Sequence, residues 1–328
     1  MGLRQEVTEL KSLMEIDPKA VVASLKGFVR DSMENLEREG IILGLSGGID
    51  SCLTTCLCSM AVGREKVLAL IMPEKDSDAR HIRDALHFAK KINVETRLID
   101  ITPYLKKFGS YKLSPLRKVP FPKKVKGALT RMSFKYYEKK TGETPFSASI
   151  SGFKDKFFGA YLRKGNAYYR IKHRVRMVLL YHYAELENRL VVGAANKTEY
   201  MTGFFVKHGC DDSADIMPLL KLYKTQVREL ARFIGIPAEI RNKPPSPDII
   251  AGITDEQAIG VPYETLDLIL LALEEGWDIR DIAAALEIEE KMVSYVKGLT
   301  LKSEHMRKTF VPDFDCNVHD HDYDKRFD

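Results

Sequence analysis

The chain has 328 residues, of which 45% are hydrophobic and 30% are charged. This composition is too apolar for a disordered chain, and no apolar run approaches the roughly 20 residues of a membrane-spanning helix, so we expect a globular protein without membrane contact. The five cysteines include no CxxC pair and indicate no disulfide framework, which favours the cytoplasm as the location.

Positive and negative charges are unevenly distributed along the chain. In total, 51 Lys and Arg stand against 46 Asp and Glu, a net charge of +5. Residues 112–176 contain 18 Lys and Arg but three acidic residues, a net charge of +15, so the remainder of the chain carries −10. A partner that is attracted by bulk positive charge should therefore bind at this segment.

The predicted elements alternate between helices and strands. Asp17 followed by Pro18 is typical of a helix start, and the apolar spacing that follows predicts an amphipathic helix up to Gly40. The apolar run 41–45 predicts a buried strand, which a glycine-rich loop follows. The remaining predictions are strands at 67–72, 94–101 and 190–194 and helices at 51–60, 78–91, 172–187, 223–234 and 263–275.

This order predicts an α/β fold with a doubly wound, Rossmann-like parallel sheet, right-handed crossovers and a helical C-terminal region. Residues 105–170, which lie between the third and fourth strands, show no clear periodicity and are interpreted as a basic insertion. We expect a single domain over residues 1–328, with an acidic and disordered tail over residues 313–328.

The strongest functional signal is the loop Ser46-Gly-Gly-Ile-Asp-Ser51, which lies directly between a predicted strand and a predicted helix. Its two glycines let the backbone approach an anion, successive N–H groups form a concave donor set, and the helix N-terminus adds a favourable field for phosphate. The loop lacks the lysine of the Walker motif and the spacing of the dinucleotide-binding motif. We therefore predict a phosphate-binding loop of another type.

This loop resembles the pyrophosphate loop of the N-type ATP pyrophosphatases, which have the adenine nucleotide alpha-hydrolase type of fold. Further stretches occur in the order found in one family of this group, so that most of residues 20–312 resembles the ammonia-dependent NAD synthases. These stretches are Ile171–Met177, Val191–Glu199, Ser213–Ile216, Lys224–Arg228, Lys243–Ser246, Thr254–Glu256 and Ser303–His305.

The resemblance implies a ligase that uses ATP as co-substrate to adenylate the carboxylate of deamido-NAD and then transfers ammonia, giving NAD, AMP and pyrophosphate. It also implies a homodimer, and a magnesium ion held by Asp50 and Glu199. The implied ATP-binding residues are Gly44, Leu45, Ser46, Gly47, Gly48, Ile49, Asp50, Ser51, Lys224 and Ser246, and the implied substrate-binding residues are Arg174, Lys207, Asp215 and His305.

Some of these residues also have plain structural interpretations. Glu199 can be an exposed carboxylate at a helix start, and Lys207 and Lys224 can be ordinary surface lysines. Asp215 lies in an apolar stretch, where an unpaired buried carboxylate would be costly, so a binding role is favoured there.

The sequence around residue 172 departs from the family. The usual Asn-x-Lys-Ala-Arg reads Arg170-Ile-Lys-His-Arg174 in this chain. Arg174 and Arg176 are two residues apart on a predicted helix, and residues at this spacing point in different directions. We therefore expect only one of the two arginines to face the site.

Other departures concern single positions. Ala194 replaces a threonine of the family, which removes a hydroxyl expected near ATP, and Met306 replaces a lysine. One residue is inserted within 209–212. The ATP and magnesium half of the family pattern is therefore kept better than the dinucleotide half.

The basic insertion leaves several functions open. It can be a solvated flap or dimer arm, a lid over a ligand, or a nucleic-acid-binding surface, which aromatic residues interleaved with the lysines favour. One alternative function is the same adenylating chemistry on another carboxylate or on tRNA, although residues 196–199 and the lack of CxxC pairs oppose tRNA. Another is a nucleotide-binding regulator without activity.

Overall fold

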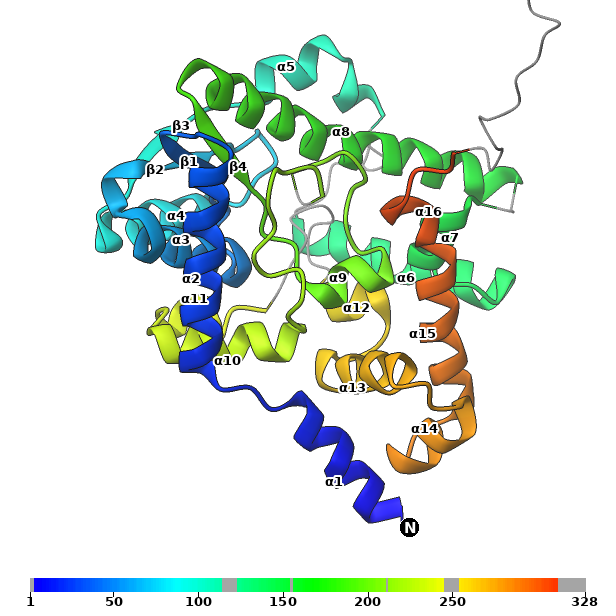
Figure 1. Cartoon of the computed structure of the whole chain (residues 1–328). Coiled ribbons are helices and arrows are strands. Elements are labelled where there is room, and N and C mark those ends of the chain that lie inside the picture. The colour runs from blue at the N-terminus through cyan, green and yellow to red at the C-terminus, as the bar shows by residue number, and fades with distance from the viewer. Residues whose placement is uncertain (1–2, 114–122, 154–155, 211, 245–253, 312–328) are drawn as a thin grey trace, which may run out of the picture.

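The computed structural model describes residues 3–113, 123–153, 156–210, 212–244 and 254–311. Within these ranges the core is a sheet of four parallel strands in the order β3-β2-β1-β4, which confirms the predicted parallel α/β fold (Figure 1). Each strand overlaps a predicted one. The strands are β1 (Gly40–Gly44), β2 (Val67–Ile71), β3 (Glu95–Leu98) and β4 (Arg189–Val192).

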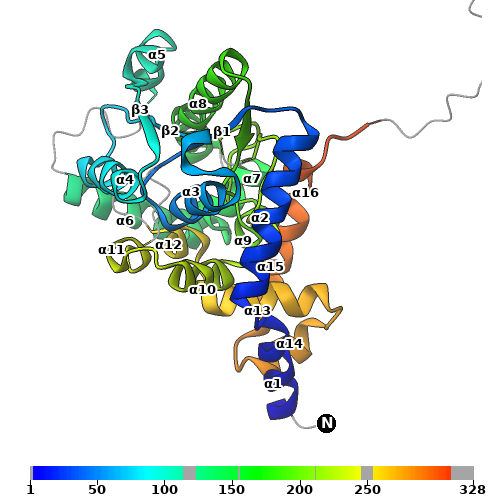
Figure 2. The same cartoon turned by 60° about the vertical axis from the view of Figure 1, so that its left-hand side comes forward.

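Helices cover both faces of this sheet (Figures 1 and 2). Because successive strand residues point to opposite faces, Ile41 and Leu43 pack into one core and Ile42 into another. Helices α3 and α4 cover the first face, with α2 and α10 packed against α3, and helices α5 and α8 cover the second. The helices are α2 (Pro18–Asn35), α3 (Ile49–Val62), α4 (Ala79–Ile92), α5 (Thr102–Lys107), α8 (Lys156–Leu186) and α10 (Lys224–Ile234).

Another core lies apart from the two on the faces of the sheet. It is formed mainly by helices of the chain beyond β4 together with the N-terminal helix. Tyr263, Leu270 and Val296 are fully buried there, and Leu10 of the first helix packs among them. The predicted helical C-terminal region is therefore confirmed. The helices of this core are α1 (Leu3–Met14), α9 (Lys197–Thr202), α12 (Asp255–Ile259), α13 (Tyr263–Glu274), α14 (Ile279–Ala285), α15 (Glu290–Lys302) and α16 (Glu304–Arg307). The short helix α11 (Ala238–Arg241) packs instead into the sheet core through Ile240.

The basic insertion is more regular than its sequence indicates. Most of its described part is helical, in α6 (Lys123–Thr141), α7 (Pro145–Ser151) and the first half of α8, with one short 3₁₀ turn, η2 (Ser110–Lys112). A second 3₁₀ turn, η1 (Arg64–Lys66), lies outside this segment, directly before β2. The segment is therefore mostly helical, although its sequence shows no clear periodicity. The first half of α8 leaves the sheet and presents polar and aromatic residues to a cavity, so it lacks the apolar stripe by which a helix is recognised.

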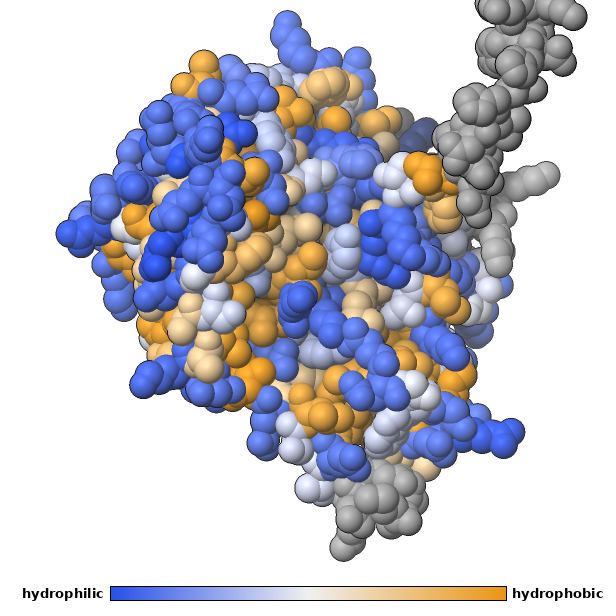
Figure 3. Space-filling model, in the orientation of Figure 1, coloured by the Kyte–Doolittle hydropathy of each residue, from blue (hydrophilic) through white to orange (hydrophobic). Residues whose placement is uncertain are grey.

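Two further expectations concern the acidic tail and the absence of membrane-spanning helices. The acidic tail over 313–328 lies outside the described residues. Among the described helices, none is long and apolar enough to cross a membrane. The face seen in Figure 3 carries hydrophilic side chains around its edge and hydrophobic ones toward its middle.

Candidate active site

A cavity of about 610 Å³ lies where the carboxyl ends of β1, β2 and β4 meet the basic insertion. Its floor includes the predicted phosphate loop, and its far wall comes from α6, α7 and α8. Ligands of open parallel sheets bind at this edge, outside the carboxyl ends of the strands. The cavity also has the size of small-molecule sites.

The phosphate loop is held by its own hydroxyl groups. The Oγ atom of Ser46 accepts a hydrogen bond from the backbone N–H of Gly48 at 3.2 Å and lies 3.1 Å from the Oγ atom of Ser51, which donates to the carbonyl of Gly48 at 3.0 Å. Gly47 has φ +79°, and a Cβ atom there would lie 2.7 Å from the carbonyl oxygen of His81. Glycine is thus required at this position, both by conformation and by space.

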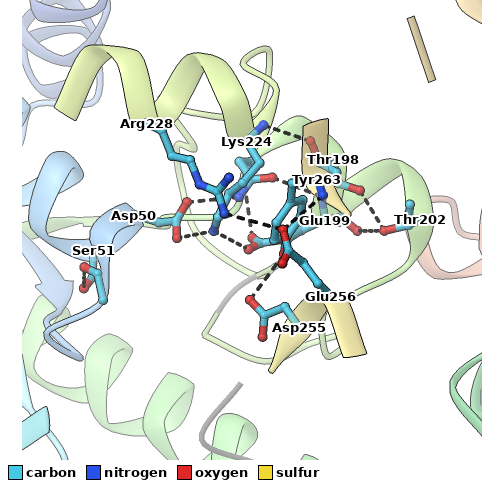
Figure 4. A network of polar contacts seen from close by, with 12 residues as sticks. Asp50, Ser51, Thr198, Glu199, Thr202, Lys224, Arg228, Asp255, Glu256 and Tyr263 are labelled. Atoms are coloured by element: carbon cyan, nitrogen blue, oxygen red, sulfur yellow. Dashed lines mark hydrogen bonds and ion pairs between the residues drawn. The ribbon is translucent and has the colours of Figure 1, made fainter. Parts of the chain in front are cut away.

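A buried lysine joins the two predicted magnesium ligands (Figure 4). The side chain of Lys224 is 1% exposed, and its Nζ atom donates to Asp50 Oδ2 at 2.6 Å and to Glu199 Oε1 at 3.2 Å. Burial by itself lowers the pKa of Lys224, but the carboxylates of Asp50 and Glu199 outweigh this effect and raise it. The interpretation of Lys224 as a surface lysine is therefore wrong.

Asn196 fixes the same two carboxylates from the other side. Its side-chain oxygen accepts from the backbone N–H of Glu199 at 3.0 Å, which caps helix α9, and its Nδ2 atom donates to Asp50 Oδ1 at 3.0 Å. Glu199 therefore stands at a helix start, but its side chain is half-buried, not exposed as the plain interpretation had it, and it lines the cavity. Burial raises the pKa of Glu199, and the negative charge of Asp50 adds to this effect, whereas Lys224 lowers it.

This donor set suits a magnesium ion. Asp50 and Glu199 contact one ammonium group and so lie within reach of a common cation. Within the described ranges, no group of three or more His, Cys, Asp or Glu is placed to hold a metal. Mg²⁺ typically takes one or two protein carboxylates and completes its shell with substrate phosphates and water, so two carboxylates beside a phosphate loop fit it.

Asp255 is a functional candidate that the sequence interpretation missed. It is 5% exposed and lines the cavity, and its Oδ2 atom accepts from the hydroxyl of Tyr263 at 3.2 Å. Within the described ranges its Oδ1 atom has no hydrogen-bond partner. Burial raises the pKa of Asp255 to about 6, and the negative charge of Asp50 adds to this effect. The only signal in the sequence was its place in the family stretch Thr254–Glu256.

Replacing Asp255 by Asn should make the stability of the metal-free and nucleotide-free protein less dependent on pH. The folded protein holds a proton on Asp255 more tightly than the unfolded chain, so this group costs stability as the pH rises from about 4 to 6. The free energy of unfolding of Asp255→Asn minus that of the wild type should increase over this interval by up to about 3 kcal/mol and then level off. Urea denaturation at a series of pH values measures this difference, and a constant difference would contradict the assignment.

The other predicted residues separate into two groups. Of the predicted ATP-binding residues in the described part of the chain, all except Gly47 line the cavity. Ser246 lies outside the described residues. The four predicted substrate-binding residues do not line this cavity, which instead includes Arg176. Arg176 donates to the carbonyl oxygen of Met72 at 3.1 Å, so of the two neighbouring arginines Arg176, rather than Arg174, faces this space.

Three of these substrate-binding candidates form a chain of contacts outside the cavity. The guanidinium of Arg174 donates to the carbonyl oxygen of Lys207, and Lys207 Nζ donates to the carbonyl oxygen of His305 at 2.6 Å. Asp215 is exposed rather than buried, so the expectation drawn from its apolar neighbours was wrong. Its carboxylate accepts from the backbone N–H of Val191 at 2.8 Å and from the hydroxyl of Tyr181 at 3.0 Å.

The basic insertion forms a large part of the cavity wall. Phe134 of α6, Phe146 of α7 and Tyr169 of α8 all line it. Among the aromatic residues interleaved with the lysines of the insertion, Tyr137 and Tyr168 are 1% and 3% exposed, whereas Tyr136 is 55% exposed. The described part of the insertion therefore matches a cover over a ligand better than an open surface for nucleic acid.

The chain matches the family model described as NAD synthase over residues 21–144 and 143–310. It is 41% identical to an NH(3)-dependent NAD(+) synthetase of Thermotoga maritima over 293 residues, which cover 89% of this chain and 98% of that protein. It is also 35% identical to the protein of the same description from Methanocaldococcus jannaschii, over 88% of this chain and 93% of that one.

Solved structures agree with this match. An NMN synthetase from Francisella tularensis superposes with a TM-score of 0.66 at 28% identity and covers 92% of this chain and 100% of its own. An NH3-dependent NAD synthetase from Campylobacter jejuni gives a TM-score of 0.62 with the same coverage. At 24% identity, the latter likeness concerns the fold alone.

Proposed function

Because the chain belongs to the NAD synthase family, we propose that it is an ATP-dependent ligase that converts the carboxylate of deamido-NAD into the amide of NAD. The observation that carries this proposal is the meeting of a phosphate loop with two carboxylates, Asp50 and Glu199, at one end of a cavity that opens onto an aromatic wall. ATP and ammonia are the other substrates, and AMP and pyrophosphate are the other products.

The loop at the end of β1 would bind the phosphates of ATP. Backbone N–H groups of residues 44–51 and the N-terminus of the 14-residue helix α3 supply fixed positive ends of dipoles. Asp50 and Glu199 would hold magnesium, which neutralises charge on the phosphate oxygens. Lys224, which already contacts both carboxylates, would stay beside the phosphates, and Ser246 is proposed as a further ATP contact.

The chemistry then needs two displacements. The carboxylate oxygen of the acceptor attacks the α-phosphorus of ATP and pyrophosphate leaves, giving an acyl-adenylate. Ammonia attacks the activated carbonyl, loses a proton and expels AMP. No side-chain nucleophile takes part, so the protein contributes mainly by orienting the reactants and by excluding water, which the cover formed by α6, α7 and α8 supports.

Arg174, Lys207, Asp215 and His305 remain the proposed contacts to the parts of deamido-NAD that extend beyond the cavity. Their position outside it is compatible with a homodimer in which the substrate reaches the subunit interface. Phe28 on α2 and Leu36, the residue after its end, are 45% and 49% exposed and would supply apolar surface to such an interface. Sedimentation analysis tests the dimer.

The cytoplasmic location also remains a prediction.

The experiment that tests the function measures pyrophosphate release from ATP and Mg²⁺ with ammonium and a panel of acceptors: deamido-NAD, nicotinate mononucleotide, other carboxylates and tRNA. We expect release with deamido-NAD, accompanied by NAD and AMP in equal amounts. Release only with another carboxylate would overturn the acceptor while keeping the chemistry. ATP binding without release from any acceptor would instead support a regulator.

A further inference from the structure

Helix α8 forms one continuous wall of the cavity. The residues that line it recur every three or four positions, at Leu162, Asn166, Arg170, His173 and Arg176. With a rise of 1.5 Å per residue, this face is about 21 Å long. Its C-terminal end lies at the sheet, where Arg176 donates to the carbonyl of Met72, and its N-terminal end lies in the insertion, away from the phosphate loop.

Arg170 is a positive charge on this face that has no counter-ion among the described residues. It is half-buried, and its Nη2 atom donates to the backbone carbonyl of Ser149 at 2.8 Å, but it forms no ion pair with any residue that the structure describes. Burial lowers the pKa of Arg170, and the nearby charge of Arg174 adds to this effect. A desolvated cation that faces a cavity and lacks an anion is costly, so a bound anion would relieve it.

Lys172, a second cation on the same helix, differs from Arg170 in having a carboxylate partner. Lys172 is buried more deeply than Arg170, and its Nζ atom pairs with Glu74 Oε1 at 2.7 Å. Glu74 also accepts from the hydroxyl of Tyr111 at 2.9 Å. This buried pair ties α8 to the segment after β2 and so fixes the orientation of the helix. Arg170 is therefore held in place by its helix and by Ser149, while its charge remains available to a ligand.

The surroundings of Arg170 suit a flat ring with an attached anion. Ser149, its hydrogen-bond partner, belongs to α7, and Phe146 of the same helix packs edge-to-face on Phe204 with the ring centroids 5.2 Å apart. Both phenylalanines and Tyr169 line the cavity. Aromatic side chains of this kind pack favourably against the faces and edges of other rings.

We propose that Arg170 binds a phosphate of the pyridine-nucleotide acceptor, in a compartment that the basic insertion builds and in which Phe146 and Phe204 contact the pyridine ring. This proposal rests on the proposed function. The carboxylate of the acceptor must reach the α-phosphate of ATP at the loop, so it belongs at the sheet end of the cavity. Arg170 lies about 9 Å further along α8 than Arg176, where the phosphate of the acceptor, rather than its carboxylate, would be found.

The test compares Arg170→Asn with Arg163→Asn. Arg163 is an exposed residue of the same helix that does not line the cavity, so its replacement removes the same charge from α8 without touching the compartment. Steady-state rates of pyrophosphate release give KM for deamido-NAD and for ATP separately. Calorimetric titration of deamido-NAD into each protein gives Kd without turnover.

We expect Arg170→Asn to raise both KM and Kd for deamido-NAD by roughly 10- to 100-fold, the loss of one charge-assisted contact, with KM for ATP within about twofold of the wild type. Arg170→Lys should recover part of the affinity, and Arg163→Asn should behave as the wild type. An unchanged Kd and KM for deamido-NAD in Arg170→Asn would overturn this proposal and leave the ligase intact. A raised KM for ATP instead would assign the guanidinium to ATP. A wild-type protein that neither binds nor converts deamido-NAD would overturn the proposed function as well.

Discussion

Asp50→Asn and Glu199→Gln should each lower kcat for pyrophosphate release by roughly 10²- to 10³-fold or more, because each removes one of the two carboxylates proposed to hold the magnesium ion that offsets charge on the phosphates. Both side chains face the cavity beside the phosphate loop, and both contact the same ammonium group of Lys224. Steady-state kinetics over a range of Mg²⁺ concentrations measures the effect. Calorimetry of ATP binding with and without Mg²⁺ adds a readout that does not depend on turnover.

A matched control for these two variants is Glu9→Gln, which removes a carboxylate from an exposed position on α1. It should keep wild-type kinetics. If either Asp50→Asn or Glu199→Gln kept wild-type activity and Mg²⁺-dependent ATP binding, the assignment of these carboxylates to the metal would be wrong. Alanine variants at the two positions should be at least as impaired.

Lys224→Met should lower the free energy of unfolding by about 3 to 5 kcal/mol, since removal of one partner from a buried ion pair leaves the other charges uncompensated. Lys224 is 1% exposed, whereas Asp50 and Glu199 are 19% and 17% exposed, so these carboxylates would face one another with little solvent screening. Lys221→Met, three residues earlier and exposed, is the control. Urea denaturation of the metal-free proteins measures both.

Two further measurements separate this cause from simple misfolding. The loss in Lys224→Met should shrink as the pH falls, because burial raises the pKa of Glu199 and protonation of this carboxylate removes its repulsion with Asp50. Adding Glu199→Gln to Lys224→Met should restore part of the lost stability, since the double variant carries one uncompensated charge fewer. A loss below about 1 kcal/mol, or no recovery in the double variant, would contradict the electrostatic role of Lys224.

Local patterns were enough to predict the sheet and the phosphate loop. Strands β1, β2 and β4 are short and mainly apolar, and Ser46–Ser51 combines glycines, hydroxyls and a helix start within six residues. Such signals involve neighbouring residues only, and they survived in the structure with shifts of a few residues at the ends of elements. The resemblance to the NAD synthases added the partners of the loop, because its stretches are spread over most of the chain.

The errors concern residues whose surroundings depend on distant parts of the chain. Asp215 has apolar neighbours in sequence but is exposed in the fold, where Tyr181 and Val191 bind it. The first half of α8 has no apolar stripe because one of its faces borders a cavity instead of a core. Neither the exposure of Asp215 nor the cavity beside α8 can be predicted from neighbouring residues in the sequence, since both depend on which distant segments pack against these positions.

The amino-acid sequence was therefore sufficient for the α/β class, the loop and the family, because these follow from spacing along the backbone. The arrangement of charges followed only from folding. Lys224 meets Asp50 across 174 residues of sequence. Arg170 faces the cavity without a counter-ion in the described part of the chain, while Lys172, two residues away, is paired with Glu74 from 98 residues away. Desolvation and pairing depend on distances between side chains, which the sheet and the insertion set together.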